Sequence, residues 1–347
     1  MSYQLNGKIS IREFLNLALT NPVIDVRSPS EYTTGHIPGA HNIPLFDDIQ
    51  RKEVGMRYKT EGRLKAILTG IDLCGPYFSL KLKNALEISD KGKVLIHCWR
   101  GGMRSEVMAW LFSLGGIEAE ILEGGYKSYR HHILDTLSVK KRMIVLGGLT
   151  GSGKTNILNY LKLKNHQVID LESLANHKGS AFGALGQSSQ PSSEHFANLL
   201  YQEWIKIKDD QPLWIEDESR NIGLVFTPDS FYSNMQENPV IVLLMDVKTR
   251  LPRLLKEYSA YAGEDLINSV NKISKRLGWE KARDAVSAIE KGDYAKAIEI
   301  LLDYYDKAYF HGLKKKPGNN ISIIRTDTDD IECNVAKILE VASKISW

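Results

Sequence analysis

Cysteine is scarce in this chain: Cys74, Cys98 and Cys333 are spread over 347 residues. An odd, widely spaced set gives no disulfide framework and no zinc-ligand spacing, and it is typical of proteins from a reducing compartment. We therefore expect a cytoplasmic protein in which Cys74 and Cys333 are structural.

Long apolar runs, internal repeats and low-complexity segments are also missing. No stretch approaches the roughly 18 apolar residues of a membrane span, and the first residues lack the charged-then-apolar pattern of a leader, so we expect no membrane partner. A net charge of only +3 gives no general attraction to nucleic acid. Any RNA contact would need local basic patches such as 127–132, 272–283 and 314–316, although such runs are more often solvated faces.

Short apolar strands alternate with helical segments in two successive groups, which predicts parallel α/β sheets. The predicted strands cover residues 23–26, 93–97, 118–122, 143–146, 167–171, 213–220, 240–245 and 321–325. Because the pattern restarts near residue 140 and the chain is long enough for two cores, we expect one domain at 1–138 and a second at 139–347. Residues 248–313 read as a helical insertion in the second domain.

A strand that ends at Cys98 runs into a glycine-containing loop and then into a helix. The loop residues are Arg100, Gly101, Gly102, Met103 and Arg104. Backbone N–H groups at such a helix start, together with two arginines, would surround an anion and hold Cys98 as a thiolate. The alternative interpretation is a small apolar cysteine at a strand end.

Five residues separate Cys98 from Arg104, which is also the signature spacing of cysteine-dependent phosphatases. A loop of this length suits a tetrahedral phosphate-like group. Two chemistries remain open: attack of the cysteine on a phosphoryl group, or transfer of a chalcogen that such a group carries. A phosphatase with a regulatory nucleotide-binding domain is therefore an alternative, and a non-enzymatic regulator is a third that the intact loop disfavours.

A second anion site follows the predicted strand 143–146. The pattern G-x-x-x-x-G-K-[ST] is met by Gly148, Gly151, Ser152, Gly153, Lys154 and Thr155. This spacing, between a strand and a helix, is typical of a phosphate-binding P-loop, in which glycines let backbone N–H groups approach the phosphates and the lysine supplies a charge. Thr155 could ligate magnesium; we expect no other metal and no tightly bound cofactor.

Two further groups of charged residues follow predicted strands. Glu216 or Asp217 would support magnesium in the second domain, and Ser219 and Arg220 lie in the same acidic stretch. Arg220 would reach the phosphates, or pair with Glu216 or Glu218. In the first domain we expect Asp25 and Arg27 to brace the Cys98 loop rather than to touch substrate.

Several stretches resemble known families. The segments Asp25–Arg27, Glu31-Tyr32 and Gly35–Ala40, followed by the Cys98 loop, resemble a rhodanese domain. A rhodanese-like domain followed by a P-loop resembles the tRNA 2-selenouridine synthase family over nearly the whole chain. Further agreeing stretches are Glu53–Gly55, Tyr58-Lys59, Gly179–Gly183, Gln190-Pro191, Glu216–Arg220 and Ile222-Gly223.

The resemblance implies a rhodanese-like parallel-sheet domain followed by a P-loop NTPase-like α/β domain with a helical insertion. It also implies that sulfur of 2-thiouridine at the tRNA wobble position is replaced by selenium from selenophosphate, through an S-geranyl intermediate made from geranyl diphosphate. On this view the partners are tRNA, geranyl diphosphate and selenophosphate, which a selenophosphate synthetase could deliver. Cys98 would handle selenium with Arg100 and Arg104 neutralising the phosphate, and the P-loop would bind geranyl diphosphate; ATP or GTP hydrolysis is the alternative for that loop.

Overall fold

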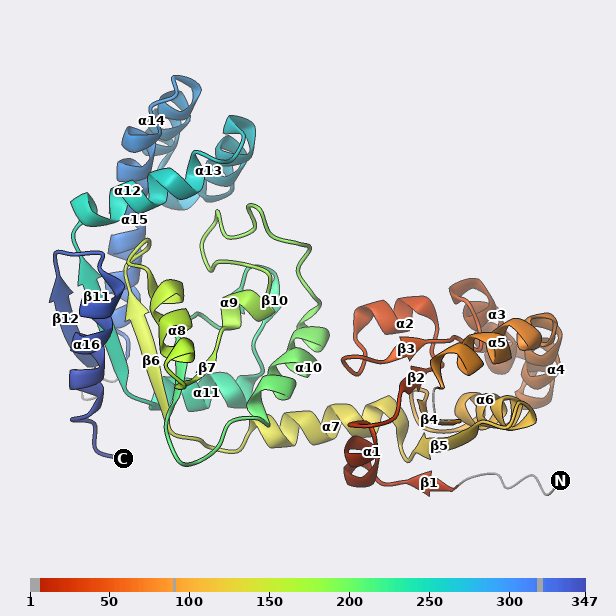
Figure 1. Cartoon of the computed structure of the whole chain (residues 1–347). Coiled ribbons are helices and arrows are strands. Elements are labelled where there is room, and N and C mark those ends of the chain that lie inside the picture. The colour runs from red at the N-terminus through yellow and green to blue at the C-terminus, as the bar shows by residue number, and fades with distance from the viewer. Residues whose placement is uncertain (1–6, 90–91, 317–320) are drawn as a thin grey trace. The chain divides into compact units, whose positions relative to one another are not determined.

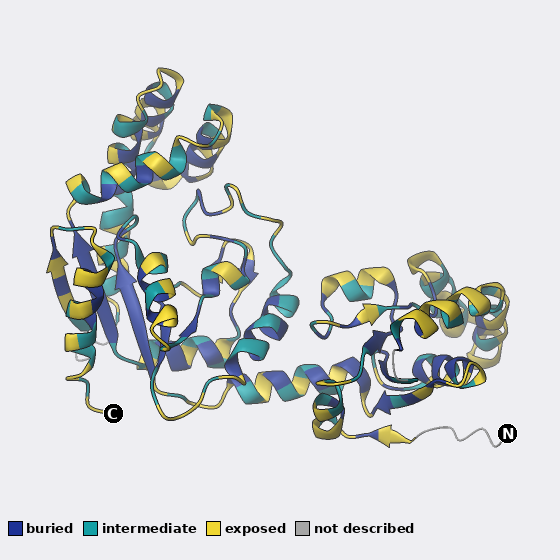
Figure 2. Ribbon diagram, in the orientation of Figure 1, coloured by how far each residue is buried: buried dark blue, intermediate teal, exposed yellow. Residues whose placement is uncertain are grey.

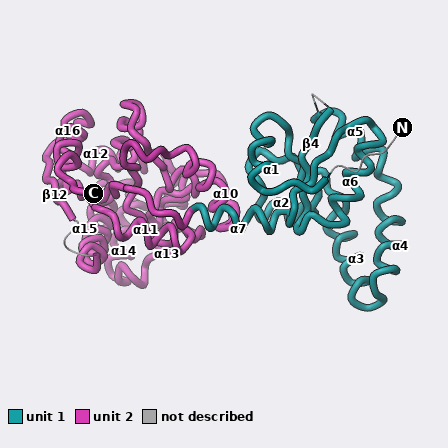
Figure 3. Tube along the Cα trace, turned by 90° about the horizontal axis from the view of Figure 1, so that it is seen from below, with its two compact units in different colours: residues 1–136 teal, residues 137–347 magenta. Residues whose placement is uncertain are grey.

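The computed structural model describes residues 7–89, 92–316 and 321–347, and the chain divides into two compact units between Thr136 and Leu137 (Figure 3). Each unit contains a parallel sheet covered by helices, so the expected α/β class is confirmed. Within the described ranges, no helix combines the length and the apolar character needed to cross a membrane.

The sheet of the first unit has the strand order β1-β5-β4-β2-β3. Its strands are β1 (Lys8–Ile9), β2 (Val23–Asp25), β3 (His41–Asn42), β4 (Lys93–His97) and β5 (Glu118–Leu122), and its helices are α1 (Ile11–Leu17), α2 (Pro29–Thr34), α3 (Asp48–Glu61), α4 (Arg63–Cys74), α5 (Phe78–Ile88), α6 (Met103–Leu114) and α7 (Gly125–Leu137). The middle of β4 is fully buried, as expected for a central parallel strand (Figure 2). The register pairs Asp25 of β2 with His97 of β4, so the carboxyl ends of both strands meet beside Cys98.

The sheet of the second unit has the order β12-β11-β6-β8-β7, with every neighbouring pair parallel. Its strands are β6 (Met143–Gly148), β7 (Gln167–Ile169), β8 (Leu213–Glu216), β11 (Val240–Met245) and β12 (Ile321–Thr326), a small ribbon is formed by β9 (Asn221–Ile222) and β10 (Val225–Phe226), and the flanking helices are α8 (Lys154–Leu163), α9 (Leu171–Leu174), α10 (Ser193–Trp204), α11 (Asp229–Glu237) and α16 (Ile331–Ala342). Strand β7 ends before the predicted residue 171 because Asp170 caps α9, accepting a hydrogen bond from the Ser173 N–H at 2.7 Å.

The predicted helical insertion consists of α12 (Val247–Tyr258), α13 (Gly263–Leu277), α14 (Trp279–Glu290) and α15 (Tyr294–Leu313). These helices enclose a core of their own, which includes Val270, Ala285 and Leu301. Figure 1 shows α13 and α14 standing beyond the sheet, whereas α15 runs back towards it. Phe182, from the loop after α9, is also buried in this core.

Candidate active sites of the two units

The Cys98 loop is folded tightly against the start of α7. Gly101 has φ +63° and Gly125 has φ +61°, a region that favours glycine. A Cβ at position 101 would overlap the carbonyl oxygen of Leu122, and one at position 125 would overlap that of Cys98. The N–H of Tyr126 donates to the Cys98 carbonyl at 2.8 Å. These contacts direct the loop carbonyls towards α7.

Cys98 is buried, with 4% of its surface exposed. Burial alone would raise the pKa of its thiol, but the Ser105 hydroxyl, the charge of Arg104 and the N–H groups of Arg100 and Gly102 together lower that pKa below its usual value. The Ser105 hydroxyl is buried near this thiol, and among the described residues no group lies at hydrogen-bond geometry to it. The other free cysteines lie in different surroundings: Cys74 is buried, with the pKa of its thiol raised by burial, and Cys333 is exposed.

The two arginines of the loop have different environments. Arg104 binds Glu31 of α2 through two hydrogen bonds, Nη1 to Oε2 at 2.6 Å and Nη2 to Oε1 at 3.2 Å. The side chain of Arg100 is exposed, as is that of Met103. Arg104 is therefore held in place by a partner that the loop sequence does not contain, while Arg100 extends into solvent.

Asp25 and Arg27 lie behind the loop, in the protein interior. Arg27 donates from Nη2 to Asp25 at 2.6 Å and to the Gly35 carbonyl at 2.6 Å, and its guanidinium lies 3.8 Å from the centre of the Tyr126 ring. Both residues are almost completely buried. Their contacts join β2, the segment after α2 and α7, an arrangement that braces the loop from behind.

His97, the last residue of β4, directly precedes Cys98 and lies opposite Asp25 in the sheet. Its Nε2 lies 3.7 Å from Asp25 Oδ2, and neither ring nitrogen has a hydrogen-bond partner among the described residues. Complete burial lowers the pKa of His97 to about 4. The imidazole is therefore neutral at physiological pH.

The P-loop follows β6, and its carbonyls are bound by the helical insertion. Arg250 of α12 donates from Nη1 to the Thr150 carbonyl at 2.9 Å, and Arg253 donates to the Gly151 carbonyl at 3.2 Å. Asp306 of α15 holds Arg250 at 2.5 Å. These contacts hold the P-loop against the helical insertion, and within the loop the Ser152 N–H donates to the Leu149 carbonyl at 3.0 Å.

The remaining P-loop residues have local contacts. Gly151 and Gly153 have φ near +80°, and Gly148 has φ +153°. Lys154 donates from Nζ to the Gly148 carbonyl at 3.0 Å, and Ser152 is buried with its hydroxyl unpartnered in the described part of the chain. The lysine and the hydroxyl are thus available to a bound phosphate.

Two carboxylates meet beside this loop, and sequence reasoning did not pair them. Thr155 Oγ1 lies 3.4 Å from Glu172 Oε2 of α9. A Cβ at Gly179 would lie 2.8 Å from Glu172 Oε1 and 2.7 Å from Glu218 Oε1, so both carboxylates touch this glycine. Burial raises the pKa of both groups; for Glu218, burial and the neighbouring Glu172 raise it to about 8, against the opposing charge of Lys154. The pair therefore shares a proton near neutral pH.

The acidic stretch 216–220 is arranged differently from the prediction. Glu216 is buried, accepts a hydrogen bond from the Leu171 N–H at 3.0 Å, and has its pKa raised well above the usual value by burial. Asp217 pairs with Lys316 and lies 3.4 Å from the Tyr309 hydroxyl, which also removes Lys316 from the basic run 314–316. Ser219 Oγ donates to the Asn221 carbonyl at 2.6 Å, and Arg220 pairs with Asp229 at 2.5 Å.

The contacts of Arg220 and Thr155 differ from those expected, whereas the reach of Arg220 to the phosphates and a magnesium-supporting role of Glu216 or Asp217 stay predictions. Arg220 does not pair with Glu216 or Glu218, because its guanidinium is bound by Asp229 at the start of α11. The carboxylate beside the P-loop hydroxyl comes from Glu172 rather than from Glu216 or Asp217. In the described ranges, no group of three or more His, Cys, Asp and Glu residues is arranged to hold a metal ion.

Three of the stretches that resemble the family in sequence lie around His177: Gly179–Gly183, Gln190-Pro191 and Ile222-Gly223. The Gln190 side chain donates to the carbonyls of Ala175 at 3.0 Å and Ile222 at 2.9 Å. Gly183 and Gly223 both lie against the His177 ring, where a Cβ would be 2.7 Å away. These contacts fix the loop that carries Gly179 to the carboxylate pair.

Comparisons with known proteins agree with this architecture. A family model described as the tRNA 2-selenouridine synthase AAA domain matches residues 141–340, and a rhodanese-like domain model matches residues 10–132. A tRNA 2-selenouridine synthase of Shewanella loihica is 33% identical over 91% of this chain and 93% of its own length. One from Marinobacter nauticus is 32% identical over 88% and 92%, respectively.

Among solved structures, a tRNA isopentenylpyrophosphate transferase from Bacillus halodurans is 14% identical and covers 59% of this chain and 96% of its own, with a TM-score of 0.35. The family models and the curated relatives span both units of the chain. The chain therefore belongs to the tRNA 2-selenouridine synthase family of enzymes.

Proposed function

We propose that this enzyme replaces the sulfur of 2-thiouridine at the tRNA wobble position by selenium, in two steps carried out at its two anion sites. The relatives' name supports the overall conversion. The observation that carries the division of labour is the pair of separate sites: a thiol of lowered pKa in one unit and a P-loop in the other.

In the first step the P-loop binds geranyl diphosphate. The thiocarbonyl sulfur of the uridine attacks C1 of the geranyl group, the C–O bond breaks, diphosphate leaves and the N3 proton of the base is released. Lys154 and the loop N–H groups stabilise the charge that develops on the leaving diphosphate. Thr155 and Glu172 are suited to hold a magnesium ion against the same phosphates, because hydroxyl and carboxylate oxygens are its usual ligands.

In the second step the Cys98 thiolate attacks the phosphorus of selenophosphate. An S–P bond forms, the P–Se bond breaks and hydrogen selenide leaves; water later hydrolyses the phosphocysteine to phosphate. The selenide attacks C2 of the S-geranyl nucleoside and geranylthiolate leaves, so no oxidant or reductant is needed. The N–H groups around Cys98 and the charge of Arg104 favour this chemistry by stabilising both the thiolate and the phosphoryl oxygens.

Binding to the full-length chain tests the P-loop assignment. We expect geranyl diphosphate to bind the wild-type protein and a Lys162→Ala control, whose exposed lysine lies on the same helix, and to bind Lys154→Ala at least tenfold more weakly, as expected for losing a charge-assisted contact. Binding of ATP without any binding of geranyl diphosphate would reject this assignment.

A further inference from the structure

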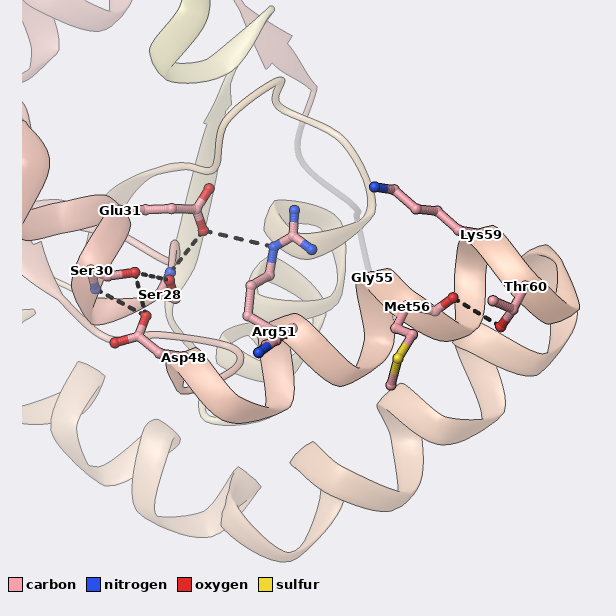
Figure 4. Close-up of a pocket in the computed structure, with 10 residues that line it drawn as sticks. Ser28, Ser30, Glu31, Asp48, Arg51, Gly55, Met56, Lys59 and Thr60 are labelled. Atoms are coloured by element: carbon pink, nitrogen blue, oxygen red, sulfur yellow. Dashed lines mark hydrogen bonds and ion pairs between the residues drawn. The ribbon is translucent and has the colours of Figure 1, made fainter.

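An open pocket of about 650 Å³ lies between α2 and α3 in the first unit (Figure 4). Three cationic side chains line it: Arg51, Lys52 and Lys59 of α3. Two of the family-like stretches, Glu53–Gly55 and Tyr58-Lys59, contribute Gly55 and Lys59 to its wall, and neither stretch has a role in the chemistry assigned above.

The acids in the pocket are bound by other groups of the protein. Asp48 Oδ1 accepts hydrogen bonds from the Ser30 N–H at 3.0 Å and the Ser30 hydroxyl at 2.6 Å. Glu31 is bound by Arg104 and by the Ser28 N–H. Neither carboxylate is therefore free to neutralise the lysines of the pocket.

The cations, in contrast, are weakly engaged. Lys52 and Lys59 form no ion pair with any described residue, and Figure 4 shows Lys59 extended away from the helix. Arg51 approaches Glu31 only through Nε, at 3.8 Å, and its side chain remains 42% exposed. Cations arranged in this way fit the phosphates of an anionic ligand.

Glu31 connects the pocket to the Cys98 loop. The same carboxylate that lines the pocket holds Arg104, whose charge acts on the Cys98 thiol. A ligand in the pocket would therefore lie on the same side of the first unit as Arg104.

We propose that this pocket binds neighbouring phosphodiesters of the tRNA backbone, one for each of its three cations, and so brings the substrate nucleoside to Cys98; the proposal rests on the proposed function. A single inorganic phosphate or selenophosphate is much smaller than the pocket, whose volume falls in the range of about 300–1,000 Å³ typical of sites for small molecules and cofactors. Exposed Met56 of α3 adds apolar surface to the same wall, and proteins that bind single-stranded nucleic acid combine such surface with cations.

The test compares two variants of equal charge change in the full-length chain. The pocket variant is Arg51→Ala, Lys52→Ala, Lys59→Ala. The matched control is Arg63→Ala, Lys65→Ala, Lys83→Ala, which removes exposed cations of α4 and α5 that line no part of the pocket. Both variants are checked for folding by circular dichroism.

We expect the pocket variant to bind 2-thiouridine-containing tRNA at least tenfold more weakly, with the slope of log Kd against log salt reduced by about 2, since each lost phosphate contact with a single strand removes about 0.7. The control variant should bind tRNA as tightly as the wild-type protein, and the KM of the pocket variant for selenophosphate should be unchanged. Unchanged tRNA affinity in the pocket variant would overturn the proposal, as would a raised KM for selenophosphate with unchanged tRNA binding, which would mark a small-anion site. Failure of the wild-type enzyme to bind tRNA would overturn the proposed function as well.

Discussion

Arg104 of the Cys98 loop and Glu31 of α2 form a two-point ion pair, with N–O distances of 2.6 and 3.2 Å. This pair fixes a positive charge beside a buried thiol, and the planar guanidinium is needed for both contacts. Arg100 contributes to the same thiol through its backbone N–H, whereas its side chain is exposed.

Replacing Arg104 by Met should raise the pKa of the Cys98 thiol, because the thiolate loses the nearest positive charge. Alkylation by an uncharged reagent such as iodoacetamide should then begin at a higher pH than in the wild-type protein. Arg100→Met is the matched control, and its alkylation profile should not move, since the backbone N–H remains. Equal shifts in both variants would show that Arg104 has no special effect on the thiol.

Gly101→Ala should destabilise the first unit by roughly 1–3 kcal/mol, because its φ of +63° and the overlap with the Leu122 carbonyl both oppose a side chain. Gly102→Ala is a close control: its φ is −106° and a Cβ there meets no atom within 4 Å. Thermal unfolding of the two variants measures the difference. Similar unfolding temperatures would mean that the loop can leave the start of α7 at little cost.

Acid should destabilise the first unit through His97. Its pKa is about 4 in the folded protein and about 6.5 when unfolded, so the unfolded chain takes up the proton first and stability is lost as pH falls from about 6.5 towards 4. The loss should reach about 3 kcal/mol near pH 4. Burial raises the pKa of Asp25, but His97 and Arg27 lower it below its usual value, so its carboxylate stays ionised over this window.

His97→Phe keeps the aromatic packing against Phe14 and Tyr126 and should remove this part of the pH dependence. His41→Phe, at an exposed position, should retain it. Urea unfolding at several pH values between about 4 and 7 distinguishes the variants; parallel curves for all three proteins would contradict the role given to His97.

Geranylation should depend on the protonation of the Glu172–Glu218 pair. The raised pKa of Glu218, about 8, predicts that the rate increases with pH as the pair loses its shared proton. Added magnesium should move the midpoint to lower pH, because the cation binds the ionised form. Glu218→Gln should abolish this pH dependence of the rate. If added magnesium leaves the midpoint of the wild-type pH profile unchanged, a cation at this site is excluded.

The features that could be predicted from the sequence are those whose residues are contiguous in the chain. The Cys98 loop and the P-loop each lie within one short stretch, and both follow a strand apolar enough to predict. Strands β1 and β3 were missed because two residues are too short to show a period.

Contacts between distant segments could not be read from the sequence in the same way. Glu172 and Glu218 meet because β7 and β8 are neighbours in the sheet, with Ile169 opposite Ile215, and that order is a property of the fold. Arg250 reaches Thr150 from a helix about 100 positions later in the chain. The burial of Glu216 and the pairing of Asp217 with Lys316 likewise involve segments that are distant in the sequence.

The most direct test of the account is a crossover reaction with full-length Cys98→Ala and Lys154→Ala, in which mass spectrometry of digested tRNA quantifies 2-thiouridine, its S-geranyl derivative and 2-selenouridine. Cys98→Ala should accumulate the S-geranyl nucleoside and form no 2-selenouridine. Lys154→Ala should leave 2-thiouridine unmodified but convert tRNA that is already geranylated. Formation of 2-selenouridine by Cys98→Ala at the wild-type rate would contradict the assignment of selenium chemistry to this cysteine.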